Sequence, residues 1–155
     1  MMQDMTDVRI NKYEVPEGVS EYHAIIRVTN PRLTYREQVD AVLAAYADLM
    51  EGDLKGASAV FKRFFLSDAA NQADYLQALH AEQSDCPLSV IEQAPLDGTK
   101  IAMWVYAQTG VQTKTLSHGI YEVKHGNYRH LWMAGACNQA LNSEFQMRLL
   151  FNDYV

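Results

Sequence analysis

The order in which hydrophobic residues repeat along the chain is the feature that most limits its fold. Segments with the two-residue alternation of a strand are interrupted twice by segments with the 3.6-residue repeat of a helix. We expect strands at residues 10–15, 22–29, 59–66, 88–93 and 100–107, and helices at residues 34–50 and 68–81. This β-β-α-β-α-β-β order predicts an α+β sandwich, with two helices on one face of an antiparallel-rich sheet.

Local signals support the boundaries of these elements. Thr34 and Glu37 have the spacing of a capping box at the start of the first helix. Gly52 follows its last turn, and we expect this glycine to end the helix in a left-handed conformation. Ser67 or Asp68 is expected to cap the second helix. Two turn sequences, residues 16–18 and 95–98, each predict a hairpin between the strands that flank them.

The pattern of the first domain begins again near residue 117. Tyr13-Glu14-Val15 recurs as Tyr121-Glu122-Val123, at an offset of 108 residues (121 minus 13). Further matches at this offset are Gly18 with Gly126, Asn30 with Asn138, Leu33 with Leu141, Gln38 with Gln146 and Tyr46 with Tyr154. Asn142 falls where Thr34 caps the first helix, and Phe145, Leu149 and Leu150 continue a helical stripe. We therefore expect a domain at 1–108, a polar linker at 109–116 and a partial second repeat at 117–155.

Composition narrows the class of function. The net charge is −6, which disfavours nucleic acid as a partner. The chain has only two cysteines and no apolar run long enough to span a bilayer, so we expect a cytoplasmic protein without a membrane partner. Three histidines near the second hairpin, His118, His125 and His130, lack a carboxylate or cysteine at ligand spacing. Strand spacing predicts His125 and His130 on opposite faces, so we expect no metal site.

Several short segments together resemble the RidA family, also called YjgF or, by an older label, the L-PSP endoribonucleases. The second copy contains a Gly-x-Tyr turn, a Gly-Asn hairpin and a small-Gly strand end, at residues 119–121, 126–127 and 134–135. In the first copy, residues 60–68, 87–92 and 100–107 are similar to the family's strand-to-helix step, its Arg-Ser-x-Val-Glu strand and its final strand. The resemblance implies a chorismate-mutase-like fold and a homotrimer, or a repeat-based pseudo-trimer, with ligand clefts between subunits.

Family members that deaminate enamines and imines, such as 2-aminoacrylate, hold the substrate carboxylate with an arginine and use a glutamate for proton transfer. They need neither a metal nor a cofactor, so the resemblance implies no cofactor for this chain. In this chain Leu88 falls at the arginine position and Trp104 at the glutamate position, and neither side chain can perform that role. The resemblance gives seven candidate cleft residues and no catalytic residue. The candidates are Tyr13, Leu88, Ser89, Glu92, Trp104, Tyr121 and Gly135.

Each candidate also has a structural interpretation. Ser89 and Glu92 are typical of ordinary strand positions, while Tyr13, Tyr121 and Trp104 are typical of core or interface packing. The sequence therefore favours a first repeat that is not catalytic and serves as a scaffold or as a binding unit, which would bind a small carboxylate or imine-like metabolite at a subunit interface. The alternatives are an enamine/imine deaminase completed by residues beyond Val155 and, less well supported, a chorismate-cleaving enzyme or an endoribonuclease.

Overall fold

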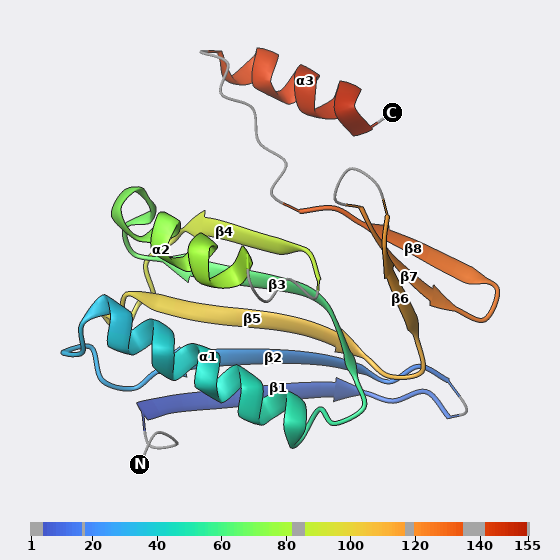
Figure 1. Ribbon diagram of the computed structural model, residues 1–155, viewed down its shortest axis with the longest axis horizontal. Helices are drawn as coiled ribbons and strands as arrows, with labels where there is room; N and C mark the ends of the chain where they lie inside the picture. The colour runs from blue at the N-terminus through green and yellow to red at the C-terminus, as the bar shows by residue number, and fades with distance from the viewer. Residues whose placement is uncertain (1–4, 17, 82–85, 117–119, 135–141, 155) are drawn as a thin grey trace.

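The protein is a mixed α+β structure, with three helices and two sheets in the part of the chain that the structure describes (Figure 1). The computed structural model describes residues 5–16, 18–81, 86–116, 120–134 and 142–154. The elements in the first 108 residues are β1 (Thr6–Tyr13), β2 (Glu21–Val28), α1 (Tyr35–Glu51), β3 (Ser58–Leu66), α2 (Ala69–Ala81), β4 (Leu88–Glu92) and β5 (Ile101–Gln108). The remaining elements are β6 (Gln112–Thr115), β7 (Tyr121–His125), β8 (Tyr128–Trp132) and α3 (Ser143–Tyr154).

The larger sheet has five strands in the order β1-β2-β5-β3-β4. Three of its four strand pairs are antiparallel, as expected, while β3 and β4 are parallel. The predicted hairpin around residues 16–18 is confirmed, because β1 pairs with β2. The predicted hairpin around residues 95–98 is wrong. The turn itself forms, with Gly98 at φ 79°, but β3 separates β4 from β5.

Both α1 and α2 cover the same face of this sheet, which agrees with the sequence prediction (Figure 1). The main core lies between the helices and that face, and includes Val39 and Val42 of α1, Leu76 of α2, Ile26 of β2 and Met103 of β5. Alternation along each strand sends every second side chain to the opposite face, which we call the open face. None of the helices in the described part of the chain combines the length and apolar character that a bilayer crossing requires.

The capping box at the start of α1 is confirmed. Glu37 accepts a hydrogen bond from the Thr34 backbone N–H at 2.7 Å, and the Thr34 hydroxyl accepts one from the Glu37 N–H at 3.3 Å. The expected conformation of Gly52 is wrong, because its φ is −101° and not positive. Glycine is needed there for space, since a Cβ atom would lie 2.9 Å from the Asp48 carbonyl oxygen.

The second sheet, β6-β7-β8, lies at one end of the open face (Figure 1). Within the segment expected to be a linker, β6 pairs with β7. At the start of α3, Asn142 Oδ1 accepts hydrogen bonds from the N–H groups of Glu144 at 2.8 Å and Phe145 at 3.3 Å, as the offset predicts. The hairpins differ, because Tyr13 pairs with Glu21 whereas Tyr121 pairs with Trp132.

Candidate functional site

A row of register partners crosses the open face of the five-stranded sheet. Ile25 of β2 lies opposite Trp104 of β5, Trp104 lies opposite Arg63 of β3, and Arg63 lies opposite Ser89 of β4. Register partners share a face, so these four side chains stand side by side on the open face. We call them the Arg63 row. It places a cation between an indole ring and a hydroxyl group.

Aromatic side chains surround the cation. The Arg63 guanidinium lies 5.4 Å from the ring centre of Phe61 and 5.7 Å from that of Trp104. His23 stacks nearly parallel to Trp104 at 5.8 Å and to Tyr106 at 4.7 Å. Each cation–π contact of this kind stabilises the cation by about 0.5–1 kcal/mol when it is partly exposed. The rings therefore hold the guanidinium in place without neutralising its charge.

Arg63 is under-satisfied for hydrogen bonding. Its Nε atom is buried, and among the described side chains it is the one buried nitrogen or oxygen without a hydrogen-bond partner. Arg63 also makes no ion pair within the described residues. A buried donor without a partner costs about 1–3 kcal/mol, and more when it is charged. A group of this kind is a natural position for an anionic ligand.

The hairpin β7–β8 closes one end of the open face. Trp132 contacts the rings of Phe61 and Tyr106, with centroids 6.0 and 5.6 Å apart, and Tyr121 donates a hydrogen bond from its hydroxyl to the Ala59 carbonyl at 3.3 Å. Burial, together with the charge of Glu21, raises the pKa of Tyr106 to about 12. Tyr106 therefore remains a neutral phenol throughout the physiological pH range.

Two of the candidate residues from the sequence, Ser89 and Trp104, lie together in the Arg63 row. Tyr13 lies at the far end of β1, paired with Glu21, with 64% of its surface exposed. Tyr121 is buried in the packing between the hairpin and the sheet. Gly135 lies outside the described residues.

Leu88 and Glu92 do not join this site. They alternate with Ser89 along β4, so they lie on the helix-covered side, where Leu88 packs against the main core. Glu92 accepts a hydrogen bond from the Ala69 N–H at 2.8 Å, at the start of α2. Its carboxylate binds this helix end and does not reach the Arg63 row.

Arg63 and His23 are not among the candidates expected from the sequence. Arg63 is next to Lys62 in the sequence, but alternation along the strand places the two side chains on opposite faces. Lys62 is 3% exposed on the helix-covered side, whereas Arg63 is half-buried on the open face. Two adjacent charged residues in an otherwise apolar strand were the available signal, because alternation places one of them on each face of the sheet. The pairing of Arg63 with Trp104 and Ser89 depends on sheet order, which the sequence did not predict.

His125 and His130 lie on the same face of the second sheet, which corrects the sequence prediction. His125 pairs with Tyr128 and His130 with Val123, so the two-residue turn brings the histidines to one side. Together with Glu21 and Gln108 they line a small cavity of about 120 Å³. No group of three or more ligating side chains in the described ranges has the geometry to hold a metal ion.

Comparison with known proteins gives no relative: no family model, no curated protein and no solved structure matches this chain.

Proposed function

We propose that residues 1–108 form a RidA-like unit that is not catalytic and that binds a small carboxylate or imine-like metabolite on the open face, where subunits meet. The observation that carries this proposal is the position of Arg63 between Trp104 and Ser89, with a buried Nε atom that lacks a partner. Arg63 would supply the arginine function that Leu88 cannot perform, from the neighbouring strand.

The chemistry of the Arg63 row suits a carboxylate. A guanidinium binds a carboxylate through two parallel hydrogen bonds, which gives both affinity and orientation. Ser89, the register partner of Arg63, adds a hydroxyl donor. The rings of Phe61 and Trp104 provide an apolar wall for the remainder of a small ligand.

We assign no hydrolytic step to this site, because the four described strands β2–β5 place no proton-transfer carboxylate beside Arg63. On β2, β3, β4 and β5, neither the Arg63 row nor the rows on either side of it contain an aspartate or glutamate. Glu92 is occupied at the start of α2. The one histidine in these rows is His23, whose ring is stacked between Trp104 and Tyr106.

The subunit arrangement follows from the uncovered part of the open face. Ile25, in the Arg63 row, is an apolar side chain with 43% of its surface exposed. The resemblance to the RidA family implies a homotrimer with ligand clefts between subunits, and we propose that the open face is the surface at which the subunits meet. Sedimentation equilibrium would test it, and a monomer at all concentrations would contradict it.

The binding step is tested by calorimetry with 2-oxobutyrate as the probe. We expect saturable binding to the wild-type protein and at least tenfold weaker binding to Arg63→Met, since a charge-assisted bidentate contact contributes about 1.5–3 kcal/mol. Arg9→Met is the matched control, because Arg9 extends the same row but pairs with Asp7. Equal loss of binding in both variants, or no binding to the wild type, would contradict the proposal.

Catalysis is tested separately by following ammonia release from 2-aminoacrylate generated in situ. A non-catalytic unit gives the same rate as the uncatalysed reaction. A clear acceleration that is lost in Arg63→Met would instead identify a deaminase and overturn the non-catalytic assignment.

A further inference from the structure

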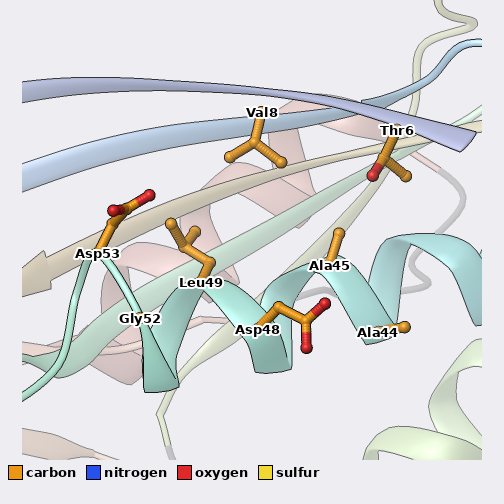
Figure 2. Close-up of a pocket in the computed structure, with 8 residues that line it drawn as sticks. All are labelled: Thr6, Val8, Ala44, Ala45, Asp48, Leu49, Gly52 and Asp53. Atoms are coloured by element: carbon orange, nitrogen blue, oxygen red, sulfur yellow. The ribbon is translucent and has the colours of Figure 1, made fainter. Parts of the chain in front are cut away.

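A groove runs between the edge strand β1 and helix α1, on the side of the sheet opposite the Arg63 row. Thr6 and Val8 of β1 point across it toward Ala45 and Leu49 of α1 (Figure 2). Its volume is about 480 Å³, which lies within the range of roughly 300–1,000 Å³ that is usual for ligand sites. The groove is open because small residues occupy much of its helix side.

The backbone of β1 has hydrogen-bonding groups available along this groove. Met5 accepts a hydrogen bond from the Thr29 N–H at 2.9 Å. Because hydrogen-bonded pairs alternate along an antiparallel ladder, the odd-numbered residues of β1 are the ones whose backbone groups bond to β2. In an antiparallel pair the intervening residues direct their N–H and C=O groups away from the partner strand. The backbone N–H and C=O groups of Thr6 and Val8 therefore point outward at the free edge of the sheet. The side chains of the same two residues line the groove.

The groove carries uncompensated negative charge. Asp48 and Asp53 line it at the C-terminal end of α1, and neither makes an ion pair in the part of the chain that the structure describes. The last turn of α1 contains no basic residue. Since the C-terminal end of a helix already has a partial negative charge, this location favours a cation.

We propose that an extended peptide segment bearing lysine or arginine binds here as an additional strand on the edge of β1. Its backbone pairs with Thr6 and Val8, as in other cases of strand addition. Alternate side chains enter the groove, where a small apolar residue contacts Val8 and Leu49 and a basic residue meets Asp48 or Asp53. The free edge distinguishes this occupant from a small amine, which would use the carboxylates but leave the strand edge unpaired.

The probe is a fluorescently labelled peptide, acetyl-Thr-Lys-Thr-Val-Thr-Lys-Thr-amide, whose binding to the full chain is followed by anisotropy at low salt. Its lysines and valine fall on one face of an extended strand. We expect saturable, salt-sensitive binding and no binding of a peptide with glutamate in place of lysine. A peptide N-methylated at alternate backbone positions keeps the charge but cannot pair. Equal binding of either comparison peptide, or no binding of the probe, would overturn the proposal.

Two protein variants locate the contact. Asp48→Asn combined with Asp53→Asn is expected to weaken binding about two- to thirtyfold, since it removes both exposed carboxylates that pair with the lysines. Asp40→Asn, at an exposed position of α1 outside the groove, is the matched control and should bind as the wild type does. Val8→Pro removes an outward N–H without breaking the β1–β2 pairing, and should abolish binding while the circular dichroism spectrum is retained. Unchanged binding to the double variant would overturn the proposal. So would an anisotropy change that comes only from self-association of the labelled peptide.

Discussion

The side-chain amide of Gln38 connects the start of β5 to the turn that precedes α1. Its Oε1 atom accepts a hydrogen bond from the Lys100 backbone N–H at 2.8 Å, and its Nε2 atom donates one to the Leu33 carbonyl at 2.9 Å. Gln38 is fully buried. A buried amide with both ends bonded fixes the position of the helix along the sheet, because any slip would leave these groups without partners.

Replacing Gln38 by methionine should lower the free energy of unfolding by about 1–3 kcal/mol, because the Lys100 N–H would remain buried without its acceptor. Urea unfolding measures this change through the midpoint, with the slope unchanged. Gln77→Met, at an exposed position of α2, is the control and should unfold as the wild type does. A loss of the same size in the control would show that the Gln38 contacts are not the cause.

Replacing Arg63 by methionine should leave the protein at least as stable as the wild type. The substitution loses two cation–π contacts of about 0.5–1 kcal/mol each but removes a buried donor that costs about 1–3 kcal/mol. Thermal unfolding measures the outcome. Arg27→Met provides a contrast, because Arg27 binds Asp7 at 2.5 Å and its removal breaks an ion pair. A large drop in melting temperature for Arg63→Met would mean that the guanidinium is part of the folded scaffold.

The capping box should make stability depend on pH in the acid range. Hydrogen bonds from the Thr34 hydroxyl, and then from its backbone N–H, hold the pKa of Glu37 below its ordinary value of 4.5. Since the pKa is lower in the folded state, the stabilisation is complete above pH 4.5 and is lost as the pH falls through the folded-state pKa. Unfolding of Glu37→Gln between pH 6 and 3 should therefore show a weaker acid dependence than the wild type. Identical profiles would contradict this assignment.

Replacing Thr34 by alanine removes the other half of the same box. This change should cost about 0.5–2 kcal/mol of stability at neutral pH, the usual effect of losing an N-cap side chain. Thr115→Ala, on the exposed strand β6, serves as a comparison that should change stability little. The difference is measured by urea unfolding of the two variants side by side.

Trp132 should control how firmly the second hairpin is attached. Trp132→Ala removes the ring contacts with Phe61 and Tyr106, so amide hydrogen exchange in β7 should become faster while exchange in β5 is unchanged. Tyr128→Ala is the matched control on the same strand, because 73% of the Tyr128 surface is exposed. Faster exchange throughout both sheets in Trp132→Ala would show that the hairpin does not open as a separate unit.

The sequence predicted the two helices of the first domain closely because their signals are local. Thr34 caps α1 as expected, and Asp68 Oδ1 accepts a hydrogen bond from the Asn71 N–H at 3.3 Å at the start of α2. Strand β1 was predicted to begin at Ile10 but begins at Thr6, and the alternation of Val8 and Ile10 with Asp7 and Arg9 was a local signal for the longer strand. Strand β6 was missed for a different reason, since all four of its side chains are polar and exposed and backbone pairing with β7 holds it.

The candidate site was only partly accessible from the sequence because it depends on which strands are neighbours. Ser89 and Trp104 were identified separately, but nothing local indicates that β3 lies between them and places Arg63 in their row. The histidine error has the same origin. Whether His125 and His130 share a face depends on the number of residues in the turn between their strands, as well as on alternation within each strand.

The position of β5 also governs the order in which the domain can assemble during synthesis. β5 is the last of the five strands to leave the ribosome, yet it is the only one that joins β1–β2 to β3–β4. A nascent chain that ends before Ile101 therefore holds two separate strand pairs, each with an unpaired inner edge. Exposed edges of this kind favour association with other chains. Until β5 has been added, the chain cannot close this sheet, and the inner edges of β2 and β3 are the places where another chain could pair with it.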